Sequence, residues 1–198
     1  MLEVNAAAKS EAAIVAALGR RSIVLVGMMG AGKSSVGRRL AARLGLAFID
    51  ADTEIEAAAG MSIADIFSAH GEAYFRSGEA RVIARLLEGG PQVMATGGGA
   101  IVNPDTRAAI RAKGVSIWLD AEYEVLLRRV KRRTDRPMLK TADPAETLKR
   151  LLAERNPVYA LADVRLRSRD APHETIVNEA IAALAAHFGM GKHTAVGS

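Results

Sequence analysis

The chain has 198 residues, a formal net charge of +5 and no cysteine, and 49% of its residues are hydrophobic. This composition suits one domain with a buried core and excludes disorder for the body of the chain. The lack of cysteine excludes a disulfide framework, a thiol nucleophile and thiolate metal ligands. The positive charge favours polyanionic partners, which include nucleoside triphosphates as well as nucleic acids.

The two ends of the chain differ in pattern from its middle. Residues 1–20 are rich in alanine and predict an N-terminal extension with a short helix, and residues 189–198 predict a flexible tail. The first residues carry Glu3 and lack the pattern of a secretory signal, and no apolar run is long enough to cross a bilayer. We therefore expect a single domain at residues 21–188 in a cytoplasmic protein without a membrane partner.

Strands and helices alternate along this domain. Strands are expected at residues 22–26, 46–49, 92–96, 115–119 and 163–167. Helices are expected at residues 33–44, at 104–113, from residue 122 into the basic segment, from residue 144 through Arg155, and at about 174–188. Between residues 53 and 88 we expect consecutive helices broken at Gly60 and Gly71, with Ser62 as a candidate cap. Such alternation is typical of a parallel sheet with helices on both faces and ligands over the carboxyl ends of its strands. The predicted fold class is therefore α/β, a three-layer α/β/α domain with a five-stranded parallel sheet.

A glycine-rich segment follows the first predicted strand directly. Its sequence, GMMGAGKS at residues 27–34, fits the pattern G-x-x-x-x-G-K-[ST]. The glycines allow backbone N–H groups to wrap a phosphate chain, Lys33 can reach the β- and γ-phosphates, and Ser34 can offer its hydroxyl to Mg²⁺. The helix that begins here adds the positive end of its dipole. The alternative is a glycine turn with an exposed lysine. The predicted ATP-binding residues are Gly30, Ala31, Gly32, Lys33, Ser34 and Ser35.

Two aspartates, Asp50 and Asp52, follow the second predicted strand. Residues two apart in an extended segment project to the same side, so both are expected to face the phosphate loop. Phosphoryl transfer needs a positioned metal ion and a group that orients the attacking hydroxyl. We expect Asp50 to support Mg²⁺ and Asp52 to act as general base or orienting group. The alternative is a helix cap at Asp52 and a solvated Asp50.

Two arginines and a run of glycines are candidates for binding the phosphoryl acceptor. Glu79 lies three residues after Arg76 and can hold its guanidinium still, and Arg155 lies near a helix end. A fixed guanidinium can bind a carboxylate or a phosphate through two parallel hydrogen bonds. If Arg76 and Arg155 both point into the pocket, the acceptor is expected to carry a carboxylate. Surface salt bridges are the alternative for each arginine. The run Gly97-Gly98-Gly99 after the third strand predicts a close backbone approach to a hydroxylated small molecule, or else a loop hinge.

The basic segment at residues 128–133, with Arg136 beyond it, predicts a lid at about residues 131–144. A lid that closes over the triphosphate excludes water from the reaction. Arg136 would stabilise charge on the transferring phosphoryl group, and Arg133 could lie against the adenine. The four histidines show no metal-ligand spacing. A solvated helix face is expected for Arg128, Arg129, Lys131 and Arg132.

Together these motifs resemble the shikimate kinase family, in order, from about residue 22 to residue 188. The segments Phe-Arg-x-x-Glu, Gly-Gly-Gly and Arg-Asn-Pro-x-Tyr make the resemblance specific, whereas the phosphate loop alone would indicate only nucleotide binding. Met138 departs from the leucine usual after Arg-Pro, a change of similar volume. The matching segments are residues 27–34, 50–52, 60–67, 71–79, 95–99, 136–137 and 154–159.

The resemblance implies a nucleoside-monophosphate-kinase-like P-loop fold with a mobile lid and a helical substrate-binding region at about residues 52–89. It implies Mg²⁺-dependent transfer of the ATP γ-phosphoryl group to the 3-hydroxyl of shikimate, on the route to chorismate and aromatic amino acids. The expected catalytic residues are Lys33, Asp52 and Arg136. The expected shikimate-binding residues are Asp52, Arg76, Glu79, Gly97, Gly98, Gly99 and Arg155. The expected metal residues are Ser34 and Asp50, and the nucleotide residues beyond the loop are Arg133, Arg136 and Arg169.

Two other functions stay open from the sequence. A gluconate kinase of the same fold would also bind a hydroxylated acid, but the segments around Arg76 and Arg155 argue against it. A nucleotide-dependent regulatory protein could bind nucleic acid through the basic segment. The lack of interleaved aromatic residues in that segment counts against this reading, so we expect no nucleic-acid partner. We also expect the protein to be a monomer.

Overall fold

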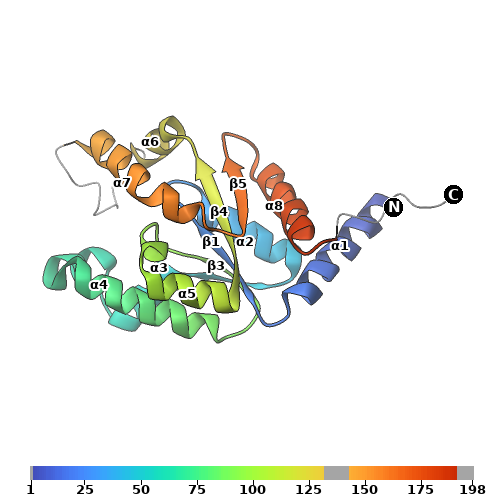
Figure 1. The fold of residues 1–198 in the computed structure, drawn as a ribbon, viewed down its shortest axis with the longest axis horizontal. Coiled ribbons are helices and arrows are strands. Elements are labelled where there is room, and N and C mark those ends of the chain that lie inside the picture. The colour runs from blue at the N-terminus through green and yellow to red at the C-terminus, as the bar shows by residue number, and fades with distance from the viewer. Residues whose placement is uncertain (1, 132–142, 191–198) are drawn as a thin grey trace.

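The computed structural model of the chain describes residues 2–131 and 143–190, with side chains from residue 9 onward. Its five strands form one sheet in the order β2-β3-β1-β4-β5 (Figure 1). Every neighbouring pair is parallel, so the predicted five-stranded parallel sheet is confirmed. The strands are β1 (Ser22–Val26), β2 (Ala47–Asp50), β3 (Gln92–Ala95), β4 (Gly114–Ala121) and β5 (Val164–Ser168). Residues 132–142 of the expected lid, which include Arg133, Arg136 and Met138, and residues 191–198 of the expected tail lie outside the described residues.

The helices form a layer on each face of the sheet (Figure 1). One layer contains α2, α8 and α1, which contact one another, and the other contains α3 to α7 with the short helix η1. In the described part of the chain, no helix is both long enough and apolar enough to cross a membrane. The helices are α1 (Leu2–Leu18), α2 (Lys33–Leu44), α3 (Ala51–Ala59), α4 (Ile63–Leu87), η1 (Ala100–Val102), α5 (Pro104–Lys113), α6 (Tyr123–Lys131), α7 (Pro144–Tyr159) and α8 (His173–His187).

Local sequence signals explain where α3 and α4 end and begin. Gly60 ends α3 with φ 64°, a left-handed conformation that glycine adopts at little cost. Ser62 begins α4 by accepting a hydrogen bond from the Asp65 backbone N–H. Gly71, with φ 79° and ψ 173°, kinks α4. The predicted breaks at Gly60 and Gly71 and the predicted cap at Ser62 are therefore confirmed.

The strand order determines which loops can meet. β1 lies at the centre of the sheet and pairs with β3 on one side and β4 on the other, with Ile23 opposite both Val93 and Val115. β2 pairs with β3. The carboxyl ends of parallel strands lie at the same edge of a sheet, so the segments after β1, β2 and β3 are brought together there.

The N-terminal extension is helical, as predicted, and it packs against the domain. Ile14 and Leu18 of α1 are fully buried in the main core. Arg43 of α2 pairs with Glu11 of α1 at 2.6 Å and with Glu174 of α8 at 2.8 Å. α1 therefore covers the junction of α2 and α8.

The packing of α2 on the sheet leaves no room for a side chain at Gly37. A Cβ atom there would lie 2.6 Å from Phe48 Cε2 and 2.9 Å from Leu25 Cδ1. We expect Gly37→Ala to lower the free energy of unfolding by about 1–3 kcal/mol, because overpacking forces neighbours to shift. Urea denaturation measures this. Gly78→Ala in α4 is the control, because a Cβ there meets nothing within 4 Å. The control should gain about 0.5–1 kcal/mol, and equal effects of the two substitutions would contradict the packing argument.

Candidate active site

The phosphate loop lies between β1 and α2 in a conformation that depends on glycine. Gly32 has φ 96°, and Gly27 has φ 136° with Leu119 O only 2.6 Å from where a Cβ would lie. The Lys33 ammonium group donates to Gly27 O at 2.8 Å and to Met28 O at 3.0 Å. Lys33 thus lies over its own loop, at the N-terminal end of α2, where the helix dipole favours an anion.

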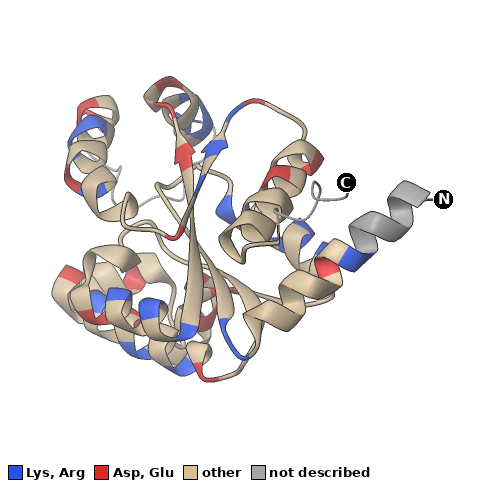
Figure 2. Cartoon of the chain, turned by 45° about the vertical axis from the view of Figure 1, so that its right-hand side comes forward, with Lys and Arg blue, Asp and Glu red and all other residues tan. Residues whose placement is uncertain are grey.

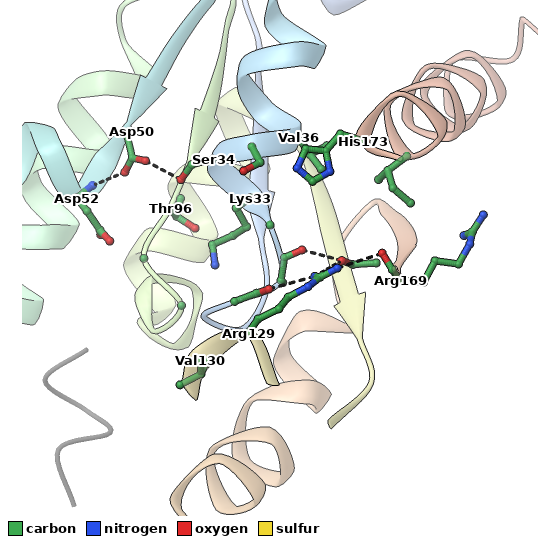
Figure 3. Close-up of a pocket in the computed structure, with 18 residues that line it drawn as sticks. Lys33, Ser34, Val36, Asp50, Asp52, Thr96, Arg129, Val130, Arg169 and His173 are labelled. Atoms are coloured by element: carbon green, nitrogen blue, oxygen red, sulfur yellow. Dashed lines mark hydrogen bonds between the residues drawn. The ribbon is translucent and has the colours of Figure 1, made fainter. Parts of the chain in front are cut away.

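Asp50 links the phosphate loop to the end of β2. Ser34 Oγ donates to Asp50 Oδ2 at 2.7 Å (Figure 3). The other carboxylate oxygen, Oδ1, accepts a hydrogen bond of 3.2 Å from the Asp52 backbone N–H. A serine hydroxyl and a carboxylate in contact are the oxygen ligands that Mg²⁺ prefers, so the pair fits the predicted metal role. Among the described residues there is no cluster of three or more acidic or histidine side chains that could hold a metal by itself.

The geometry of the aspartate pair differs from the prediction. α3 already begins at Ala51, so Asp50 is its N-cap and Asp52 lies in its first turn. The expected extended segment was wrong, and so was the alternative that placed the cap at Asp52. Both aspartates nevertheless line the same cavity as Lys33 and Ser34 (Figure 3). Asp50, as the N-cap, keeps an extended backbone with φ −102° and ψ 112°, and Asp52 in the first helical turn still reaches the same cavity.

This cavity has a volume of about 380 Å³ and lies over the carboxyl ends of the strands. One part is lined by the phosphate loop, Asp50, Asp52 and the segment from Thr96 to Gly98, and the other by Arg129, Arg169, His173 and Ile176. Figure 3 shows Asp52 and Thr96 on the opposite side of Lys33 from His173 and Arg169. The convergence of three strand ends, on which the sequence prediction depended, is therefore present. The cavity therefore extends to both sides of Lys33.

Arg76 and Glu79 form a half-buried ion pair beside this cavity. Arg76 Nη1 lies 2.6 Å from Glu79 Oε2, and Arg76 Nη2 lies 3.2 Å from Glu72 Oε1. The Glu79 side chain is only 2% exposed. Burial raises the pKa of Glu79 above its usual value, and the nearby Asp52 carboxylate adds to this, whereas Arg76 and Arg155 lower it. The expected role of Glu79 in holding the Arg76 guanidinium is confirmed.

The three glycines after β3 lie where this charged cluster leaves no space for a side chain. A Cβ on Gly97 would lie 2.7 Å from Glu79 Oε1 and 3.0 Å from Asp52 Oδ1. A Cβ on Gly99 would collide with the Arg76 guanidinium, and one on Gly98 would lie 3.7 Å from Arg155 Nη1. The triple glycine therefore gathers Asp52, Arg76 and Arg155 around one stretch of bare backbone. Arg155 is buried, and Arg76 pairs with the buried Glu79 as well as with the half-exposed Glu72, so neither arginine forms only a surface salt bridge.

Tyr159 fastens this stretch to α7. Its hydroxyl donates to Gly98 O, and its ring stacks on Trp118 with centroids 6.0 Å apart. Arg155 lies one turn earlier on α7 and is 6% exposed. Burial raises the pKa of Tyr159 to about 12, although the Arg155 charge beside it acts in the opposite direction. The sequence segment Arg-Asn-Pro-x-Tyr thus supplies one cation for the site and one anchor for its glycine loop.

We expect Tyr159→Phe to lower the free energy of unfolding at pH 8 by about 1–3 kcal/mol, because the Gly98 carbonyl loses its donor. The folded-state pKa lies above the ordinary tyrosine value of 10.0. The stability that the tyrosine proton contributes is therefore present below about pH 10 and lost as the pH rises towards 12. Urea denaturation at several pH values measures both effects, and the phenylalanine variant should lack the alkaline loss. Tyr74→Phe, at a ring 56% exposed, is the control. An equal loss of stability in both variants would contradict this role of Tyr159.

Arg129 is a site residue that the sequence prediction missed. It was assigned to a solvated helix face, but its guanidinium donates to Gly30 O at 3.2 Å, to Ser168 Oγ at 3.1 Å and to Arg169 O at 3.1 Å. It therefore joins the phosphate loop to the segment after β5. The overlooked signal is helical spacing, since Arg129 lies between the buried Leu126 and Val130 on the inner face of α6.

Arg169 lines the cavity but its charge is directed elsewhere. Its guanidinium forms an ion pair with Glu179 of α8, and the Arg169 side chain is exposed. Figure 3 shows the side chain pointing away from Lys33. The predicted nucleotide contact of Arg169 stays a prediction. His173 and Thr96, which the sequence analysis did not single out as site residues, also line the cavity.

Comparison with known proteins places this geometry in a family. The family model described as shikimate kinase matches residues 29–185. A shikimate kinase of Bradyrhizobium diazoefficiens is 66% identical over 181 residues, which cover 91% of this chain and 87% of that protein. A shikimate kinase of Rhodopseudomonas palustris is 66% identical over 174 residues, which cover 88% of this chain and 86% of that protein.

A solved structure supports the same placement. The shikimate kinase from Acinetobacter baumannii in complex with shikimate superposes with a TM-score of 0.81 at 34% identity, over 87% of this chain and 96% of that one. The family model covers most of the chain, and the described fold and its converging loops are those of the P-loop kinases. The chain therefore belongs to the shikimate kinase family.

Proposed function

We propose that this chain transfers the γ-phosphoryl group of ATP to the 3-hydroxyl of shikimate, giving shikimate 3-phosphate and ADP. The observation that carries the proposal is the single cavity that brings the phosphate loop, Asp52, Gly97 and Gly98 together. Family membership supports ATP as the phosphoryl donor, Mg²⁺ as the metal and shikimate as the acceptor. Gluconate, the acceptor of the rival hypothesis, is not favoured by these relatives.

The phosphate loop and Lys33 would hold the triphosphate. Backbone N–H groups of the loop and of the first turn of α2 bind the phosphate oxygens, and Lys33 exchanges its loop carbonyls for the β- and γ-phosphates. Ser34 and Asp50 would hold Mg²⁺, which when bound neutralises charge on the phosphates. Arg129 keeps the loop against the β5 end, and Arg136, outside the described residues, is proposed to stabilise the transferring group.

Asp52 would act on the acceptor. Its carboxylate lies 3.0 Å from where a Cβ of Gly97 would be, so a small molecule seated on this backbone meets Asp52 directly. Asp52 accepts the proton of the attacking hydroxyl while the phosphoryl group moves to that oxygen. Arg76 and Arg155 converge on the neighbouring glycines and would bind the shikimate carboxylate between two guanidinium forks. Glu79 holds Arg76 at 2.6 Å and thereby keeps the fork oriented.

The proposal is tested with purified protein, ATP and Mg²⁺ in an assay that couples ADP release to a detectable reaction. Shikimate and gluconate are offered separately, and the phosphorylated product is identified by ³¹P NMR. We expect turnover with shikimate and only the background ATPase rate with gluconate. Turnover with gluconate alone would overturn the assignment.

The regulatory-protein hypothesis predicts binding of oligonucleotides that weakens steeply with salt, without acceptor phosphorylation. Figure 2 shows basic and acidic residues interspersed on the described helices of this view. The absence of a nucleic-acid partner stays a proposal. The monomeric state and the cytoplasmic location also stay proposals. The first can be measured by light scattering and the second by cell fractionation.

A further inference from the structure

We propose that a second cavity, between α3 and α4, is a binding site for a small apolar carboxylate. The cavity has a volume of about 330 Å³, within the range of small-molecule sites, and shares no lining residue with the active-site cavity. Its apolar wall comes from Ile55, Ile66, Phe75 and Val82, which belong to a small hydrophobic cluster separate from the main core. Figure 1 shows α3 and α4 on the side of the sheet away from α8.

A glycine inside α4 keeps this cavity open. Gly78 lines it, and a Cβ atom on Gly78 would meet no atom within 4 Å. Glycine inside a helix destabilises it relative to alanine, so the position has a cost that no neighbouring group requires. Gly37 of α2 is different, because Phe48 and Leu25 fill the space beside it. The space over Gly78 is therefore available to an occupant that is not part of the chain.

Two cations at the rim determine the charge of that occupant. Arg81 and Arg85 line the cavity one helical turn apart. In residues 2–131 and 143–190, neither guanidinium has a carboxylate within ion-pair distance. Like charges four residues apart repel on a helix, and a shared carboxylate removes that repulsion through charge-assisted hydrogen bonds. Tyr74, exposed by 56%, adds an aromatic ring at the rim. An apolar body against Phe75 and Val82 with its carboxylate at the arginines matches this lining.

The site is coupled to the active site through Phe75. Phe75 forms part of the cavity wall, and the next residue, Arg76, places its guanidinium 5.0 Å from the centroid of the Phe75 ring. An occupant that packs on Phe75 restrains the ring against which Arg76 lies. Because Arg76 is proposed to bind shikimate, the occupant should change the affinity for shikimate, and shikimate should change its affinity by the same factor. This coupling rests on the proposed function, whereas the binding site itself does not.

Isothermal titration calorimetry with 3-phenylpropionate tests the site, with 3-phenylpropanamide as the uncharged probe of the same shape. We expect the acid to bind with a dissociation constant of about 1 mM or below and the amide to bind at least tenfold more weakly. Gly78→Leu, which fills the cavity, and the double variant Arg81→Gln/Arg85→Gln should each weaken the acid at least tenfold. Arg111→Gln, at an exposed arginine of α5, should bind as the parent does. Thermal unfolding checks that each variant is folded. Gly78→Ala fills less of the cavity than Gly78→Leu and should therefore weaken the binding of the acid less.

Several outcomes would overturn the proposal. These are no binding of the acid up to 10 mM, equal binding of acid and amide, or unchanged binding in folded Gly78→Leu. A dimer seen by light scattering that Gly78→Leu abolishes would assign the cavity to a second copy of the chain instead. For the coupling, the KM of shikimate should shift at least twofold with saturating 3-phenylpropionate while the KM of ATP stays constant. Binding of 3-phenylpropionate to a protein that does not turn over shikimate would refute the proposed function but would still support the binding site between α3 and α4.

Discussion

Asp52→Asn is expected to lower kcat by about 10²–10⁴-fold, the usual contribution of a general base, while the affinity for ATP stays within about twofold. The carboxamide keeps the size of the side chain but cannot accept the proton of the attacking hydroxyl. Asp50, not Asp52, holds the Ser34 hydroxyl and caps α3, so the substitution leaves the phosphate loop and the start of the helix intact. The effect should therefore lie on the chemical step.

The measurement combines steady-state kinetics with fluorescence titration of an ADP or ATP analogue. Asp105→Asn is the matched control, because Asp105 also lies in the first turn of a helix, α5, but is exposed and outside the cavity. It tests whether the loss comes only from removing a negative charge near a helix N-terminus. Near-normal turnover in Asp52→Asn would mean that Asp52 is not the general base. An equal loss of nucleotide affinity would mean that Asp52 acts at the metal site rather than on the acceptor.

Arg76→Ala is expected to weaken shikimate binding by about 2–5 kcal/mol, which is the usual cost of removing one partner of a buried charge pair. Arg76 converges with Arg155 on the triple glycine and is the partner of Glu79, whose side chain is 2% exposed. The alanine variant loses a fork for the substrate carboxylate and leaves the Glu79 charge buried without its nearest cation. The KM of ATP should change little, since Arg76 does not line the nucleotide part of the cavity.

The KM of shikimate and direct calorimetric binding measure this effect, with Arg111→Ala on the exposed face of α5 as the control. The double variant Arg76→Ala/Glu79→Gln separates the two causes. It should recover the part of the protein's stability that the unpaired Glu79 charge removes, but not the affinity for shikimate. An unchanged shikimate affinity in Arg76→Ala would mean that another residue holds the carboxylate.

Much of this architecture could be predicted because the signals are local. The glycines and lysine of the phosphate loop specify its backbone without help from distant residues. Gly60, Ser62 and Gly71 end, begin and kink helices by their own conformational and hydrogen-bonding properties. The alternation of strands and helices then leaves few topologies, and those topologies place the loops after the strands at one edge.

The misassigned residues depended on partners far away in the sequence. Arg129 reads locally as one cation in a basic run, and only the packing of α6 against the phosphate loop, 99 residues earlier, gives its guanidinium the Gly30 carbonyl. The exposed side chain of Arg169 pairs with Glu179 of α8, and its predicted nucleotide contact stays a prediction. At Asp50 and Asp52 the shared cavity was predicted but the backbone was not, because α3 begins at Ala51, two residues before the expected helix start at residue 53.

The sequence by itself determined the fold class, the phosphate loop and the set of residue types that a carboxylate-bearing acceptor requires. The tertiary structure decided which of those side chains share a cavity. It buried Glu79 against Arg76, placed both arginines against the triple glycine and fastened that glycine loop to Tyr159. The physical reason is that backbone conformation follows from nearby residues, whereas burial and charge pairing exist only once β1, β3, α4 and α7 are assembled.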